Sequence, residues 1–108
     1  MVAHKREQTP LEYLSNSDRE FAEGNHRQSA FFLWKATESV FIKIAQTQGL
    51  DPDDLITVAR NLDEQDTLRK HYYLGHLSTG WALRDHAEMD LMEDHELAEP
   101  REATRRFI

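Results

Sequence analysis

Residues 24–49, GNHRQSAFFLWKATESVFIKIAQTQG, decide the fold of this 108-residue chain. The stretch lies between two glycines suited to left-handed positions at helix ends, and its apolar residues recur at spacings of three and four. This pattern predicts a helix over 26–48, with Asn25 as its N-cap and Gln28 closing a capping box. The expected core-facing stripe consists of Ala30, Leu33, Trp34, Thr37, Val40, Phe41 and Ile44. We therefore expect this helix to be the central one.

Further helices are indicated by the prolines. Three segments place a capping residue before a proline and an acid after it: TPLE (9–12), DPDD (51–54) and EPRE (99–102). Besides the central helix, the predicted helices cover 10–23, 52–62, 66–89 and 99–108. No segment shows the sustained period-two alternation of a strand. The prediction is an all-α fold, a single domain over 1–108 built as an antiparallel up-and-down bundle of four to five helices.

Composition narrows the range of partners. The formal charge is −7, with 20 acidic and 13 basic residues, which disfavours binding to a nucleic-acid backbone. The absence of cysteine excludes disulfides and thiolate metal sites and is compatible with a reducing cytoplasm. Residues 1–10 lack the apolar core of a signal peptide, and no apolar run approaches the roughly 20 residues that span a bilayer. We expect a soluble cytoplasmic protein without membrane association.

Two apolar residues of the central helix lie away from its core stripe. At about 100° per residue, Phe31 and Ile42 fall close to Lys35 and Glu38, in an otherwise polar sector. Another surface must cover them, and in a small domain a second subunit is the simplest candidate. The sequence therefore predicts a homodimer with Phe31 and Ile42 in its interface. The alternative is that another helix or a chain terminus covers both residues.

One face of the helix predicted over 66–89 has unusually small side chains in its middle. Residues on this seam alternate in spacing between four and three: Leu68, Tyr72, Gly75, Thr79, Ala82, His86 and Met89. Small side chains permit either close packing around Trp34 or Trp81, or a groove for a ligand. The candidate groove residues are Trp34, Tyr72, Gly75, Thr79 and His86.

Arg69 and His76 in RKHYYLGH (69–76) would share one face of that helix. Such a pair could supply the phosphate-stabilising cation and the acid/base of a ribonuclease. The spacing itself carries little weight, because REFAEGNH (19–26) repeats it across the break at Gly24. The competing interpretation is that both residues belong to a wall of the bundle.

Metal and nucleophile chemistry find little support. His86 and Asp90 are one helical turn apart and are weak candidate metal ligands, but no second helix offers a matching pair. No serine lies in a nucleophile-elbow context, and no glycine-rich loop follows a strand. No cofactor is expected.

Residues 13–49 resemble the first helical hairpin of HEPN-like proteins, particularly their small PaREP-type branch. The similarity lies in GNHRQSAFFLWKA (24–36): a Gly-Asn turn, then RQSA, then a tryptophan followed two positions later by alanine. The layout of residues 83–108 is also similar to the end of that branch. The resemblance implies a bundle of four or five helices that is commonly a dimer. The family includes toxin ribonucleases, partners of minimal nucleotidyltransferases and many small proteins of unknown role.

Ribonuclease members of this family carry an arginine and a histidine that face a dimer cleft, which the resemblance maps to Arg69 and His76. Here Lys70 follows the arginine, where those members usually have asparagine, aspartate or histidine. The leading hypothesis is therefore a non-catalytic binding or partner module, a homodimer that could pair with a minimal nucleotidyltransferase. The alternative is a toxin-like ribonuclease that uses Arg69 and His76.

Overall fold

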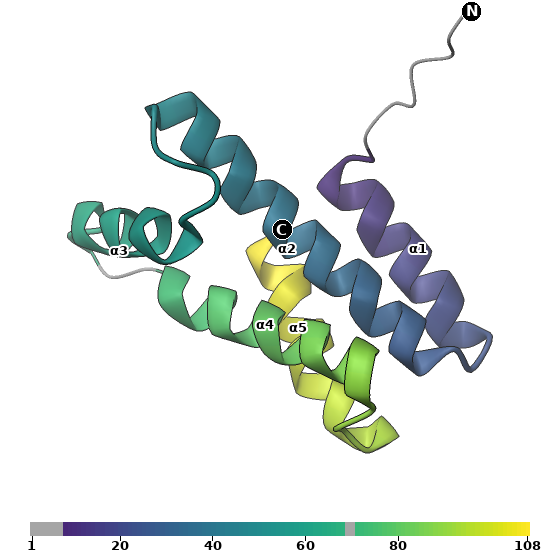
Figure 1. The fold of residues 1–108 in the computed structure, drawn as a ribbon. Helices are drawn as coiled ribbons and strands as arrows, with labels where there is room; N and C mark the ends of the chain where they lie inside the picture. The colour runs from purple at the N-terminus through teal and green to yellow at the C-terminus, as the bar shows by residue number, and fades with distance from the viewer. Residues whose placement is uncertain (1–7, 69–70) are drawn as a thin grey trace, which may run out of the picture.

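The computed structural model describes residues 8–68 and 71–108 and contains only helices in these residues, which confirms the all-α prediction (Figure 1). The elements are α1 (Pro10–Ala22), α2 (His26–Gln48), α3 (Leu55–Gln65), α4 (Tyr73–Met89), the 3-10 turn η1 (Asp94–Leu97) and α5 (Ala98–Phe107). Within the described ranges, no helix combines the length and the apolar composition needed to cross a membrane.

The helices pack around α2 (Figure 1). α1 and α2 form an antiparallel hairpin, α4 lies along the other side of α2, and α5 passes behind α4. α3 lies near the end of α2, where the chain turns toward the start of α4. The central position predicted for the helix over 26–48 is therefore confirmed.

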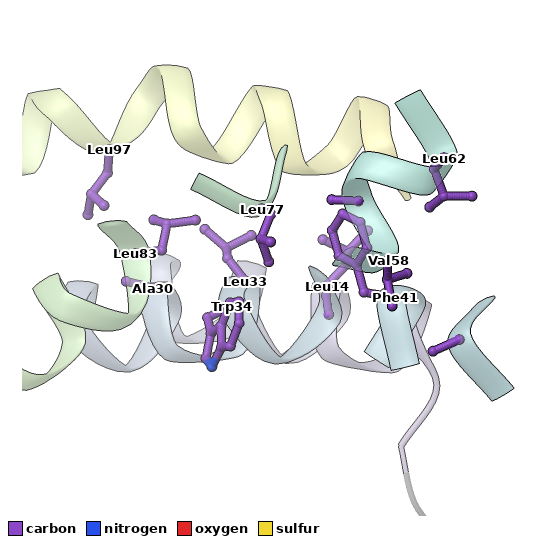
Figure 2. Packing of buried hydrophobic residues seen from close by; sticks show 13 residues of the cluster. Leu14, Ala30, Leu33, Trp34, Phe41, Val58, Leu62, Leu77, Leu83 and Leu97 are labelled. Atoms are coloured by element: carbon purple, nitrogen blue, oxygen red, sulfur yellow. The ribbon is translucent and has the colours of Figure 1, made fainter. Parts of the chain in front are cut away.

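The core lies between α2, α4 and α5 and extends to α3 (Figure 2). Its buried apolar residues are Leu14, Ala30, Leu33, Trp34, Ala36, Phe41, Ala45, Val58, Ala59, Leu62, Leu77, Leu83 and Leu97. Most of the stripe predicted for α2 is buried, whereas Val40 and Ile44 are only partly covered. Each fully buried leucine or phenylalanine stabilises the fold by about 1.5–3 kcal/mol.

The first two helices begin at the predicted places by different means. The Thr9 hydroxyl accepts a hydrogen bond from the Glu12 backbone N–H at 3.1 Å, as the proline-based pattern predicts. Asn25 occupies the N-cap of α2, but its side chain donates to Glu20 at 2.8 Å and makes no capping bond. The predicted capping box with Gln28 is therefore wrong, and the Asn25 backbone N–H, which Gln28 would have to accept from, donates to the Glu20 carbonyl at 2.8 Å.

α3 begins later than predicted, at Leu55 instead of 52. The Asp54 carboxylate accepts bonds from the Thr57 N–H at 3.2 Å and the Thr57 hydroxyl at 2.7 Å, which caps the helix. These hydrogen bonds, first that of the Thr57 hydroxyl, lower the pKa of Asp54. Pro52 lies in a turn whose Asp51 carboxylate accepts from the Asp53 N–H at 2.9 Å.

α4 also begins later, at Tyr73 instead of near Asp66. The Asp63 carboxylate accepts from the N–H groups of Tyr73 at 2.7 Å and Leu74 at 3.1 Å, so a residue of α3 caps the start of α4. The Asp66 carboxylate meanwhile accepts from the His71 N–H at 2.8 Å. The predicted start was wrong, because residues 66–68 and 71–72 are not helical and the Asp63 carboxylate caps the helix only at Tyr73.

The acidic segment between α4 and α5 contains η1. Glu93 and Glu96 form a capping box around it, and Leu97 is fully buried. α5 follows at once, so Pro100 is its third residue and not its first. Capping and a single buried leucine thus turn a polar loop into an ordered link to α5.

Candidate functional site

A groove lies between the first half of α2 and the last part of α4, and we call it the α2/α4 groove. Its volume is about 840 Å³, within the range of small-molecule pockets. It is lined by Glu20, Gly24, Asn25, His26, Arg27, Gln28, Phe31, Trp34, Lys35, Arg84, His86, Ala87, Glu88, Asp90 and Asp94. Both helices contribute side chains at spacings of three and four, so one face of each forms a wall.

Two aromatic side chains supply apolar surface to the groove, and one arginine lies over the ring of the more buried of the two. Phe31 is 39 % exposed, whereas the Trp34 ring is buried in the core with an edge on the groove. The Arg84 guanidinium lies over the Trp34 ring at 5.5 Å and over the Trp81 ring at 5.9 Å. A cation in this position is attracted by both ring faces, which holds Arg84 beside the groove.

His86 is the most buried ionisable side chain of the groove, with 1 % of its surface exposed. Its Nδ1 accepts a hydrogen bond from the Met92 N–H at 2.9 Å, which assigns the proton of the neutral ring to Nε2. Nε2 has no hydrogen-bond partner and is buried. His86 is thus held in place by the Met92 N–H, and its buried Nε2 is not accessible from the open groove.

The start of α2 is tied to the end of α4 at one rim. Arg27 donates from Nε to the Ala87 carbonyl at 3.2 Å and from Nη2 to the Glu88 carbonyl at 2.8 Å. These carbonyls lie in the last turn of α4, where a cation also faces the negative end of the helix dipole. The Asp94 carboxylate lies 2.7 Å from His26 Nδ1 and extends the rim toward η1.

Charges in the groove nearly balance. Arg27, Lys35 and Arg84 are opposed by four carboxylates, those of Glu20, Glu88, Asp90 and Asp94. Such a mixture does not attract a polyanion such as RNA by net charge. It suits a small ligand that has a flat apolar part and several polar groups.

The predicted groove residues do not all lie in one place. Trp34 and His86 meet in the α2/α4 groove, whereas Tyr72, Gly75 and Thr79 do not line it. The Tyr72 ring covers Gly75, so a Cβ at that glycine would touch the ring. The predicted seam of the helix is also displaced: Leu68, Tyr72 and Met89 are exposed, and the buried face carries Leu77, Gly80, Leu83 and His86.

The small residues of α4 serve helix packing at Gly80. A Cβ at Gly80 would lie 2.8 Å from Cε3 of Trp34 and 3.2 Å from Cγ2 of Thr37, so the glycine lets α4 approach α2. This is the close packing around Trp34 that the sequence offered as one explanation of the small seam.

Of the predicted catalytic pair, only one residue can be placed. Arg69 lies outside the described residues. The His76 ring stacks on Phe107 of α5 with centroids 4.4 Å apart. Burial lowers the pKa of His76, and the charges of His71 and Arg106 lower it further, against an opposing effect of Asp63.

The candidate metal ligands do not converge on a site. His86 Nδ1 and Asp90 Oδ1 are 4.0 Å apart, and that nitrogen already accepts from the Met92 N–H. Within residues 8–68 and 71–108, no three His, Asp or Glu side chains are grouped as metal ligands would be.

No family model, curated protein or solved structure matches the chain. The site is therefore interpreted from its own geometry. Arg27 was missed by sequence reasoning, because the Ala87 and Glu88 carbonyls that it binds lie 60 and 61 positions later in the chain. Arg84 was also missed: Trp81 is its neighbour in α4, but Trp34 belongs to α2. The signal that could have found this wall is the spacing of Phe31, Trp34 and Lys35, which places an exposed ring beside a buried one.

Proposed function

We propose that this chain is a non-catalytic binding module of HEPN-like type that holds a small molecule with a flat apolar body in the α2/α4 groove. The observation that carries the proposal is the Arg84 guanidinium over the Trp34 ring, next to the exposed Phe31 ring on the wall of the same groove. A flat ring of the ligand packs against the Phe31 ring and the Arg84 guanidinium.

The module acts as a homodimer through the exposed side of α2. Phe31 is 39 % exposed and Ile42 is partly exposed, and both lie on the side of α2 away from its core stripe. A second copy removes this apolar surface from water. A minimal nucleotidyltransferase is the protein partner that the family resemblance suggests.

No observation favours the ribonuclease alternative. The His76 ring is covered on one face by Phe107, and its lowered pKa follows from burial and neighbouring positive charge. Neither feature provides a partner for phosphate. The chain keeps its net charge of −7, which repels an RNA backbone.

Ligand binding is tested by tryptophan fluorescence and thermal unfolding. The chain has two tryptophans, and Trp81 does not line the groove, so a Trp81→Phe variant reports on Trp34 alone. The probes are AMP, ATP and indole-3-acetate at millimolar concentration. At least one probe is expected to quench Trp34 and to raise the Tm.

The test variant and its matched control each remove one arginine that is exposed or half-exposed. Arg84→Ala removes the groove cation, whereas Arg60→Ala on α3 removes an exposed arginine outside the groove. The Tm shift should be lost in the first variant and kept in the second. Absence of any shift with all three probes, or equal shifts in both variants, contradicts the proposed ligand site.

A further inference from the structure

One stripe of α2 faces away from the helices that pack on it. At about 100° per residue, Phe31, Lys35, Glu38 and Ile42 fall within a sector of about 60°. α1 and α4 lie on either side of α2 (Figure 1), and these four residues keep part of their surface exposed. We call this set the α2 stripe. It has an apolar residue at each end and an ion pair in the middle.

The ion pair is half-buried within one chain. Lys35 Nζ lies 2.7 Å from Glu38 Oε1, and the two side chains are 34 % and 26 % exposed. The stripe is flanked by the α2/α4 groove on one side and by a groove of about 530 Å³ beside the start of α1 on the other. Lys35 lines both grooves, so the stripe stands between two hollows.

The order of residues in the stripe is self-complementary. Phe31 and Ile42 are equally far from the midpoint between Ala36 and Thr37, and so are Lys35 and Glu38. When two copies of α2 lie antiparallel about this midpoint, the twofold axis brings Phe31 opposite Ile42 of the partner subunit. The same axis brings Lys35 opposite Glu38 of the partner subunit, twice over. A parallel arrangement would instead place like charges opposite each other.

We infer that the α2 stripe binds a second copy of this chain in antiparallel register, with two intermolecular pairs of Lys35 and Glu38 between two contacts of Phe31 and Ile42. This inference rests on the homodimer of the proposed function and specifies its interface. Charge complementarity selects the copy and its direction, and the apolar ends supply buried surface. Since Phe31 also lines the α2/α4 groove, the partner's Ile42 forms part of the rim of that groove.

Charge reversal tests this register. In Lys35→Glu both central pairs join two glutamates, and in Glu38→Lys both join two lysines, so each variant should dissociate roughly 10- to 100-fold more readily. Mixing the two variants restores two opposite-charge pairs and should give a heterodimer. The Lys35→Glu/Glu38→Lys double variant should dimerise like the wild type. Sedimentation equilibrium measures all four, and circular dichroism confirms that each variant is folded.

Cysteine pairing tests the apolar ends. The natural chain has no cysteine, so any disulfide reports on the introduced positions. A mixture of Phe31→Cys and Ile42→Cys chains should give a cross-linked dimer under mild oxidation, whereas either chain alone should give much less. Preferential cross-linking of Phe31→Cys with itself would indicate another register and overturn the inference.

Controls separate failure of the register from failure of the dimer. Arg60→Glu and Glu64→Lys make the same charge changes at exposed positions of α3 and should leave dimerisation unchanged. A wild-type chain that stays monomeric at high concentration overturns both the homodimer and this interface. A wild-type dimer that is indifferent to reversal at Lys35 and Glu38, or is not restored by mixing, overturns the interface alone.

Discussion

The first turn of α4 and the rest of the helix contain the same residue types in opposite surroundings. The first turn carries Gly75 and His76, which are partly exposed near Tyr72 and Phe107. The rest of the helix carries Gly80 and His86, which are buried, Gly80 against Trp34 of α2 and His86 next to the Met92 N–H. A glycine or histidine in a helix therefore has no fixed role, and the neighbouring helices determine it.

The histidines should show the largest difference. His86→Ala removes a buried ring and leaves the Met92 N–H without its acceptor, so we expect a loss of about 2–4 kcal/mol in the free energy of unfolding. His76→Ala removes one stacked, partly exposed ring and should lose about 1 kcal/mol or less. Urea unfolding of both variants measures this. Equal losses would contradict the difference between the surroundings of His86 and His76.

Gly80 should be more sensitive to substitution by alanine than Gly75. Gly80→Ala brings a Cβ to 2.8 Å from the buried Trp34 ring, which cannot move freely. We expect a net loss of about 1–3 kcal/mol from overpacking, measured as a lower urea midpoint. A neutral result would mean that α2 and α4 can separate slightly without cost.

Gly75 should tolerate substitution by alanine. In Gly75→Ala the new methyl meets the Tyr72 ring, but Tyr72 is 67 % exposed and can rotate away. Alanine favours the helix over glycine by up to about 1 kcal/mol, so the net change should lie between zero and that gain. A large loss of Tm would show that the Tyr72 ring is held in place.

The smallest effect concerns pH and His76. Because its pKa is lowered in the folded state, the unfolded chain takes up a proton first as the pH falls. The stabilisation is present above the unfolded pKa of about 6.5 and is lost as the pH falls toward the folded value. Between pH 7.5 and 5.5 the wild type should therefore lose more stability than His76→Gln. Identical losses in the two proteins would contradict this.

Local patterns predicted α2 well, because its periodicity, its glycine boundaries and its core stripe all lie within one stretch. The start of α4 could not be predicted in the same way, since its capping carboxylate belongs to Asp63 in the preceding helix. The small seam was predicted on a face of α4 next to the face that packs against α2. That error followed from the wrong start, because it included Leu68 and Tyr72 as helical residues.

The candidate site was only partly accessible from the sequence. Trp34 and His86 were selected from spacing and residue type, and both line the α2/α4 groove. Arg84 lies over Trp81, its i−3 neighbour in α4, and over Trp34 of α2; no local pattern reveals the second contact. The position of the His86 ring proton on Nε2 likewise depends on the Met92 N–H, which lies beyond the end of α4.

The hydrogen bonds of Arg27 also have a kinetic consequence. The last carbonyls of α4 are satisfied by a side chain 60 and 61 positions earlier in the chain, so the final turn of α4 closes a long loop. The hairpin of α1 and α2 requires only short-range closure, which is entropically cheaper and faster. The hairpin should thus form before the end of α4 docks on it. Arg27 would then act after the folding barrier, where it slows unfolding and leaves the folding rate almost unchanged.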